Sequence, residues 1–96
     1  MSQPLSVIIV NYRTPDLTIK CVRSLLRHGV AEPKDIIVVE NASGDTSMDV
    51  LRAALDCTLV QATENGGYGA GVNFGMRHAR HELVLCLNPD LSLIHI

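Results

Sequence analysis

Apolar and polar positions follow two different periods along this chain. Four short runs rich in β-branched and aliphatic residues predict strands at 5–10, 35–40, 57–62 and 82–87. The first two are continuously apolar in their interiors, which is typical of strands buried on both faces. Apolar residues at helical spacing lie between the strands and predict three helices: Leu17, Cys21, Val22, Leu25 and Leu26 in the first, Met48, Leu51 and Leu55 in the second, and Val72, Met76 and Ala79 in the third.

Residues typical of helix ends support these boundaries. Thr14 can cap the first helix, Pro15 suits its first turn, and Gly29 suits its end. Asp45 or Ser47 can cap the second helix.

The alternation of strand and helix predicts an α/β fold of three layers, in which a parallel sheet has helices on both faces. Right-handed crossovers bring the carboxyl ends of all strands to one edge, where ligands of such sheets bind. Polar residues follow every predicted strand: Asn11, Tyr12 and Arg13; Glu40, Asn41 and Asp45; Glu64, Asn65 and Gly66; Asn88 and Asp90. The order of elements therefore predicts one polar cleft built from four loops.

Composition narrows the class of protein. A length of 96 residues allows one domain at most, and 47% apolar with 19% charged residues indicates a globular chain. A net charge of -2 with scattered basic residues argues against nucleic-acid binding. The three cysteines have no paired spacing, and the N-terminus has neither a signal-peptide pattern nor a membrane span. We therefore expect a cytoplasmic protein, with peripheral attachment to the inner face of the membrane as a further option.

The glycine-rich segment "ENGGYGAGVNFG" begins the third predicted helix. Glycines there let the backbone approach a phosphate at a helix N-terminus, although for the glycines alone a loop that needs tight turns is the favoured interpretation. The dinucleotide fingerprint does not fit, because Phe74 occupies the position of its third glycine. A P-loop does not fit either, because the Gly-Lys-Ser/Thr ending is missing.

Two acidic residues at strand ends are candidates for ligand contact. Glu40 ends a buried strand, where a charge is costly unless it is solvated or paired, and it can accept hydrogen bonds from a ribose or a base N–H. In the segment Asn88-Pro89-Asp90, Pro89 ends the strand ladder and would hold Asp90 rigidly at the sheet edge. An ordinary turn is the alternative, but beside the other loops a site for Mg²⁺ or Mn²⁺ is favoured, since these cations take carboxylates and substrate phosphates.

The segments "LSVIIVNYRTPDL", "IIVVENASGDTS", "ENGGYGAGVNFGMRHA" and "LCLNPDL" resemble, in order and spacing, family 2 glycosyltransferases and especially their rhamnosyltransferase-like branch. The resemblance implies a GT-A fold with strand order 3-2-1-4, and transfer of a sugar from a nucleoside diphosphate with inversion. It implies that Glu40 stands where the family usually has Asp, which contacts the base or ribose. By the same resemblance Asn88-Pro89-Asp90 stands at the Asp-x-Asp position, with Asp90 as the metal ligand. The nucleotide-sugar-binding residues that it implies are Asn11, Tyr12, Arg13, Glu40, Asn65, Gly66, Gly69, Asn73 and Asn88.

Family members continue beyond this point with an acceptor site and a late carboxylate that acts as general base. We therefore expect residues 1–96 to be a single partial domain, the donor-binding half of the enzyme, and inactive in isolation. The implied partners are a dTDP- or UDP-sugar and, in the full-length enzyme, a glycan or lipid-linked acceptor. Truncation would leave the fourth strand exposed and favour self-association through it.

Other functions stay open to different degrees. A catalytically inactive nucleotide-binding remnant or fragment is the alternative reading of the same motifs. A sugar-1-phosphate nucleotidyltransferase or a nicotinamide-dependent oxidoreductase would need a glycine-rich loop after the first strand, and "NYRTPD" contains no glycine.

Overall fold

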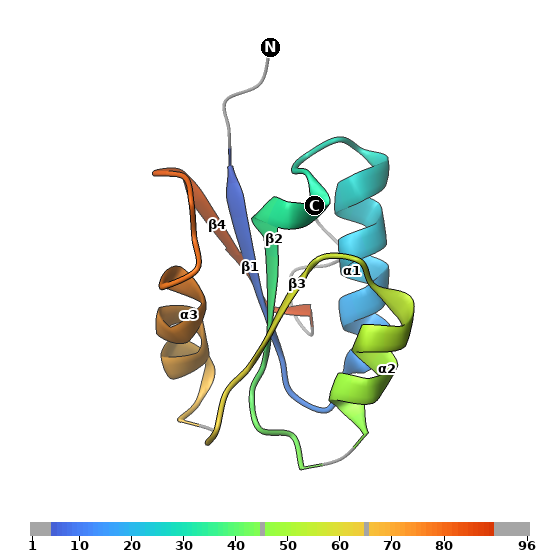
Figure 1. Ribbon diagram of the computed structural model, residues 1–96, viewed down its shortest axis with the longest axis vertical. Helices are drawn as coiled ribbons and strands as arrows, with labels where there is room; N and C mark the ends of the chain where they lie inside the picture. The colour runs from blue at the N-terminus through green and yellow to red at the C-terminus, as the bar shows by residue number, and fades with distance from the viewer. Residues whose placement is uncertain (1–4, 45, 65, 90–96) are drawn as a thin grey trace.

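The computed structural model describes residues 5–44, 46–64 and 66–89 (Figure 1). Every predicted strand and helix is present, with one additional 3₁₀ turn. The elements in chain order are β1 (Ser6–Asn11), α1 (Pro15–Arg27), η1 (Pro33–Asp35), β2 (Ile36–Glu40), α2 (Ser47–Ala54), β3 (Thr58–Gln61), α3 (Tyr68–Met76) and β4 (Val84–Leu87).

The strands form one sheet in the order β3-β2-β1-β4, and every neighbouring pair is parallel. This confirms the predicted order and direction of the strands. The register aligns Asn11 with Glu40 and Glu40 with Gln61. The last residues of three strands therefore lie side by side at one edge.

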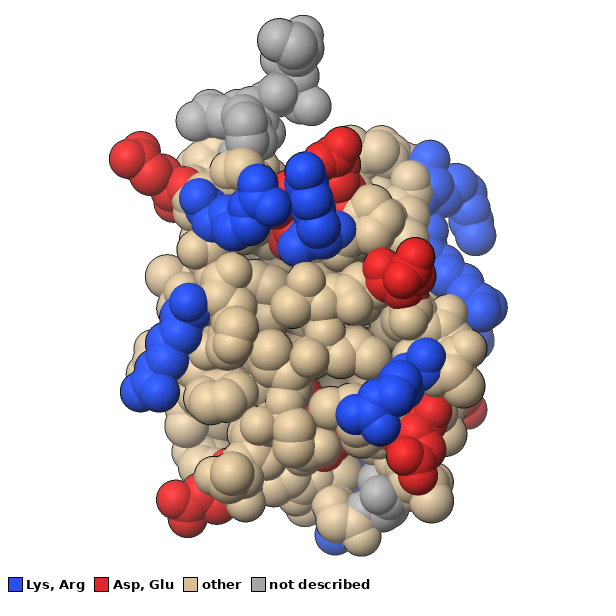
Figure 2. Space-filling view, viewed as in Figure 1, with Lys and Arg blue, Asp and Glu red and all other residues tan. Residues whose placement is uncertain are grey.

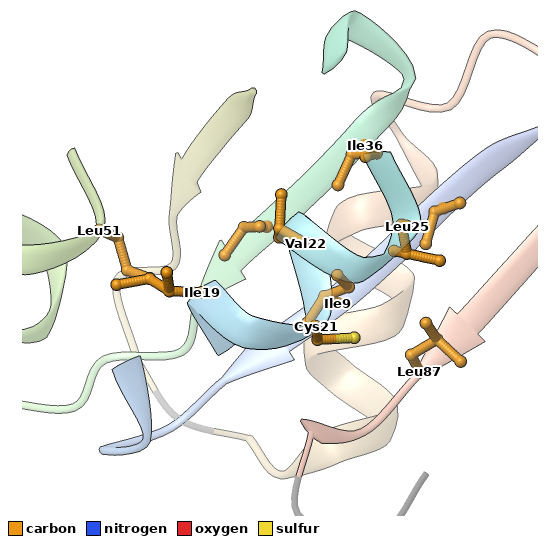
Figure 3. Close-up of a cluster of buried hydrophobic side chains, with 10 residues drawn as sticks. Ile9, Ile19, Cys21, Val22, Leu25, Ile36, Leu51 and Leu87 are labelled. Carbon is orange, nitrogen blue, oxygen red and sulfur yellow. The ribbon is translucent and has the colours of Figure 1, made fainter. Parts of the chain in front are cut away.

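Helices cover both faces of the sheet, with α1 and α2 on one side and α3 on the other (Figure 1). Because successive strand residues point to opposite faces, Val7 and Ile9 contribute to one buried cluster, and Ile8 and Val10 contribute to the other. Figure 3 shows the first cluster, in which side chains of the sheet meet those of α1 and α2. The three-layer architecture is confirmed.

The two ends of α1 are built differently. Thr14 occupies the cap position, but its hydroxyl makes no cap hydrogen bond to any described residue, and its carbonyl accepts from Thr18 N at 3.0 Å. At the other end Gly29 has φ +65° and donates from its N–H to the Leu26 carbonyl at 3.1 Å. The left-handed conformation explains the glycine at this helix end.

The start of α2 differs from the prediction. Thr46 holds the cap position, and Ser47 is the first helical residue. The expected cap at Ser47 is therefore wrong by one position, and Asp45 lies outside the described residues.

The buried side of α3 differs in part from the prediction. Val72 and, just beyond the helix, Ala79 pack against the buried cluster as expected, but Met76 is 46% exposed, and the buried residues of the helix are Gly71 and Gly75. A Cβ atom at Gly75 would lie 2.7 Å from Ile8 Cγ2. The helix backbone thus approaches the sheet directly at Gly71 and Gly75, and these glycines share the interface with the apolar side chains of Val72 and Ala79.

β3 and β4 form the two edges of the sheet. In the view of Figure 1, β3 lies in front, and Figure 2 shows that side chains of both charges surround the centre of this face and leave it largely uncharged. At the other edge Cys86 of β4 is exposed. Within the described ranges, every helix is too short or too polar to cross a membrane.

Candidate functional site at the strand ends

The predicted cleft lies at the carboxyl ends of the strands, where the described loops converge. The parallel ladder continues for one residue beyond β2 and β3, because Asn41 N donates to the Asn11 carbonyl at 2.8 Å and Ala62 N donates to the Glu40 carbonyl at 2.9 Å. β4 ends at Leu87 and delivers Asn88 to the same edge. The topology thus places polar residues from distant parts of the chain next to one another.

Glu40 is the centre of a hydrogen-bond network at this edge. Its side chain is buried, with 3% exposed. Oε1 accepts from Asn11 Nδ2 at 3.2 Å and from Ser43 Oγ, and Oε2 accepts from Ser43 N at 3.1 Å and Gln61 Nε2 at 3.2 Å. The charge is therefore stabilised by hydrogen bonds from β1, β3 and its own loop.

Asn11 connects this network to α1. Its side chain is fully buried, and its Oδ1 accepts from Thr18 Oγ1 at 2.7 Å while its Nδ2 donates to Glu40. In this arrangement both ends of the Asn11 amide are engaged within the protein.

The loop after β1 is tied to the loop after β2. Arg13 N donates to Ser43 Oγ and Arg13 Nε donates to the Ser43 carbonyl, each at 2.9 Å. Arg13 has φ +58° and Ala42 has φ +54°. Left-handed backbone at non-glycine residues is strained and persists only where the surroundings hold it, so these two loops are tightly constrained.

Tyr12 is presented to solvent by this constrained loop. The residue is 42% exposed, and the guanidinium carbon of Arg13 lies 5.2 Å from the centroid of its ring, within cation–π range. Burial and the neighbouring Cys86 raise the pKa of Tyr68, the other tyrosine at this edge. Tyr68 therefore keeps its hydroxyl proton, and can donate a hydrogen bond, at neutral pH.

A pocket of about 220 Å³ opens between these groups. It brings Tyr12 and Asn88 together, as the sequence predicted, and adds residues of β1, of the loop after β2 and of the start of α3. Its lining residues are Val10, Tyr12, Thr14, Asn41, Gly67, Tyr68 and Asn88.

A second hollow, of about 270 Å³, lies on the other side of Asn41. It contains the predicted residue Gly66 together with Ala62, Thr63, Glu64, Ala70 and Phe74. Asn41 borders both hollows and donates from Nδ2 to the Gly67 carbonyl at 3.2 Å, which fixes the start of α3 against β2. Gly69 and Asn73 are exposed on α3 and line neither of these two hollows.

The N-terminus of α3 lies between the two hollows. Gly67 caps it with φ +92°, and the first turn contains no acidic residue. The positive end of the helix dipole is therefore open to an anion.

The metal prediction falls on a part of the chain that the structure does not describe. Asp90 and Asn65 both lie outside the described residues, so their predicted roles stay predictions. Among residues 5–44, 46–64 and 66–89 no cluster of three or more His, Cys, Asp or Glu side chains could hold a metal ion.

Sequence reasoning missed several members of the site. Ser43 and Gln61 complete the environment of Glu40, and Tyr68 lines the pocket. Gln61 could have been predicted as a neighbour of Glu40, because a parallel register that aligns the strand ends pairs these two residues. Nothing in the sequence beyond its position in a loop indicates a role for Ser43.

Comparisons with known proteins agree with this geometry. The profile of Glycosyl transferase family 2 matches residues 6–94. The Low-salt glycan biosynthesis hexosyltransferase Agl10 of Haloferax volcanii is 37% identical over 97 residues, which covers 97% of this chain and 30% of that protein. A Poly(ribitol-phosphate) beta-glucosyltransferase of Bacillus spizizenii is 30% identical over 92 residues, covering 90% of this chain and 14% of that protein. The chain thus spans less than a third of the length of these relatives.

Proposed function

Since this chain belongs to glycosyl transferase family 2, we propose that it is the donor-binding part of an inverting sugar transferase that uses a nucleoside diphosphate sugar. The observation that carries the proposal is the convergence of the strand-end loops and the N-terminus of α3 on one pocket of about 220 Å³. Such a pocket lies where open α/β sheets bind their ligands.

The chemistry of the pocket suits the parts of a nucleotide sugar. Tyr12 and Tyr68 offer aromatic surface for a base or a sugar ring, and the positive end of the α3 dipole suits a diphosphate. Asn88 adds an amide that can donate to a phosphate or accept from a hydroxyl. Arg13, Asn65, Gly66, Gly69 and Asn73 complete the proposed binding surface, and Asn11 and Glu40 belong to it through the network beneath.

The donor we propose is a dTDP- or UDP-sugar. The names of both relatives describe transfer of a hexose, which supports a hexose on the donor. A rhamnosyl donor is the narrower expectation, and it rests only on the resemblance of the sequence to the rhamnosyltransferase-like branch of the family.

We assign the divalent cation to Asp90. The residue follows Pro89, which is buried, and Asn88, which lines the pocket. Mg²⁺ commonly uses one or two protein carboxylates and completes its coordination with substrate phosphates and water, so a single carboxylate beside a diphosphate fits this ion. When bound, the cation would neutralise charge on the leaving diphosphate.

Titration calorimetry with UDP and dTDP tests donor binding and metal dependence together. We expect weak binding that tightens with Mn²⁺ or Mg²⁺ and loses this dependence in Asp90→Ala. Asp56→Ala makes the same change near the start of β3, at the amino ends of the strands and away from the pocket, and should keep the metal dependence of binding. Equal affinity with and without metal would remove the cation from the proposal, and no binding of either nucleotide would remove donor binding itself.

The proposal also includes the acceptor substrate and the location of the protein in the cell. In the full-length enzyme the acceptor is a glycan or a lipid-linked sugar, and the chain works in the cytoplasm or peripherally at the inner face of the membrane. A catalytically inactive nucleotide-binding remnant or fragment is the second candidate that the same motifs leave open. An in-frame continuation in the genomic DNA beyond the last codon would decide for the enzyme.

Self-association through β4 is a further part of the proposal. β4 is an edge strand, Cys86 on it is exposed, and Leu83 just before it is 46% exposed. Cys86→Lys would place a charge on this edge and should shift a dimer to monomer in analytical ultracentrifugation, because charged edge strands resist pairing. A monomer before substitution would contradict the proposal.

A further inference from the structure

The acceptor capacity of the Glu40 carboxylate is used up within the protein. A carboxylate offers about four lone-pair sites, and four donor groups occupy them: Asn11 Nδ2, Ser43 Oγ, Ser43 N and Gln61 Nε2. The side chain is also almost fully buried. A ligand N–H could bond to Glu40 only by displacing one of these donors. Displacing the donor of Asn11 or either donor of Ser43 would leave it buried and unpaired, whereas Gln61 is exposed and its Nε2 also donates to the Ala62 carbonyl at 3.1 Å.

The network around Glu40 continues to the surface of the pocket. The Ser43 hydroxyl donates to Glu40 and accepts from Arg13 N at 2.9 Å, while the Ser43 carbonyl accepts from Arg13 Nε at 2.9 Å. Arg13 in turn lies over the ring of Tyr12, which lines the pocket. A continuous series of contacts therefore connects a buried carboxylate to an exposed aromatic ring.

The strained backbone of Arg13 indicates that these contacts hold the loop in one conformation. Arg13 keeps its left-handed backbone while both its N–H and its guanidinium are bonded to Ser43. Without the Ser43 bonds, this conformation would be unfavourable and the loop would relax. Ser43 itself is oriented by its two bonds to the Glu40 carboxylate.

We infer that Glu40 is a positioning residue, which acts through Ser43 and Arg13 to hold Tyr12 at the pocket, and that it does not contact the bound nucleotide. The inference rests on the proposed function for the identity of the ligand. It differs from the role that the family resemblance implies for this position, where a shorter Asp contacts the base or ribose. The longer side chain of Glu40 instead reaches back to Ser43 in its own loop.

The positioning role can be measured without a ligand. The chain has two tyrosines and no tryptophan, so the ring ¹H–¹³C NMR signals of Tyr12 can be assigned with Tyr68→Phe. We expect Glu40→Gln and Ser43→Ala to move the Tyr12 signals in the same direction as Arg13→Ala, because all three break the same series of contacts.

A buried carboxylate elsewhere provides the matched control. Asp35 is 6% exposed, and its carboxylate pairs with His81 and Arg80 at the opposite edge of the sheet. Asp35→Asn should leave the Tyr12 signals unchanged although it also alters a buried acid. Unchanged Tyr12 signals in Glu40→Gln, or an equal change in Asp35→Asn, would overturn the inference.

Binding of UDP and of N3-methyl-UDP tests whether Glu40 contacts the base. Glu40→Gln should weaken both nucleotides by a similar factor, roughly tenfold, and leave their affinity ratio as in the parent chain. If the parent prefers UDP and Glu40→Gln abolishes that preference, Glu40 accepts from the base N–H and the inference is wrong. If the parent binds neither nucleotide, the proposed function fails, and the ligand-free Tyr12 signals alone decide for or against the positioning role.

Discussion

Substitution of Gly75 by alanine should test how closely α3 packs on the sheet. A Cβ atom at this position would lie 2.7 Å from Ile8 Cγ2 and 3.0 Å from Val39 Cγ2, on two different strands. Real Cβ atoms essentially never lie within 3.0 Å of another atom, so either the helix or the side chains of Ile8 and Val39 must shift. The neighbouring face of the sheet is a packed cluster of buried side chains, which limits that shift.

Gly69→Ala provides the matched control because it lies on the same helix and its Cβ would have no neighbour within 4 Å. In a helix, alanine is preferred to glycine by up to about 1 kcal/mol, and this gain applies to both substitutions. Overpacking a well-packed core typically costs about 1–3 kcal/mol, and this cost applies only to Gly75. The free energy of unfolding of Gly75→Ala should therefore lie about 1–3 kcal/mol below that of Gly69→Ala.

Urea unfolding followed by far-UV circular dichroism measures this difference, and thermal melting provides an independent check. For a domain of this size about 1 kcal/mol corresponds to 4–8 °C in Tm, so the two variants should melt several degrees apart. Gly69→Ala should be at least as stable as the parent chain. Equal unfolding free energies for the two variants would show that α3 does not approach the sheet as closely as the structure indicates.

Three further outcomes follow from the structure. The isolated chain should release no nucleoside diphosphate in an acceptor-dependent assay with UDP- and dTDP-sugars, because transfer needs a general base. Glu40 is buried and hydrogen-bonded, so Glu64 is the exposed carboxylate of the described strand-end loops, and turnover that is lost in Glu64→Gln would contradict this prediction. Burial raises the pKa of Cys57 to about 11, so iodoacetamide at pH 8 should label the exposed Cys86 first in mass spectrometry, and Cys57 labelling should accelerate as the pH approaches 11; the reverse order of labelling would refute this. Asp35→Asn should lower the free energy of unfolding by about 1–3 kcal/mol in urea, since it disrupts a buried, paired carboxylate, and an unchanged midpoint would argue against the pairing with His81.

The sequence by itself determined the class of fold and the edge at which the site lies. Runs such as Val7–Val10 and Ile36–Val39 bury both faces of a strand, and only a sheet covered on both sides can accommodate them. Once strands and helices alternate, the handedness of the crossovers sends Asn11, Glu40 and Asn88 to one edge. These conclusions depend on local patterns and general rules of chain topology, so residue order was sufficient for them.

The packing of α3 could not be predicted in this way. Sequence periodicity identifies a buried helix face by its apolar side chains, and glycine has no side chain to contribute to that signal. Gly71 and Gly75 are buried because Val10, Ile8 and Val39 occupy the space beside them. The position of a neighbouring methyl group belongs to the tertiary structure.

The surroundings of Glu40 were also only partly predictable from the sequence. Its place at the end of a buried strand already required that the charge be solvated or paired. Which groups pair with it depends on the strand register, which brings Gln61 and Asn11 alongside, and on the loop conformation, which turns Ser43 back toward the carboxylate. Hydrogen bonds are directional and short-ranged, so their partners are decided only when segments far apart in the sequence come within about 3 Å of one another.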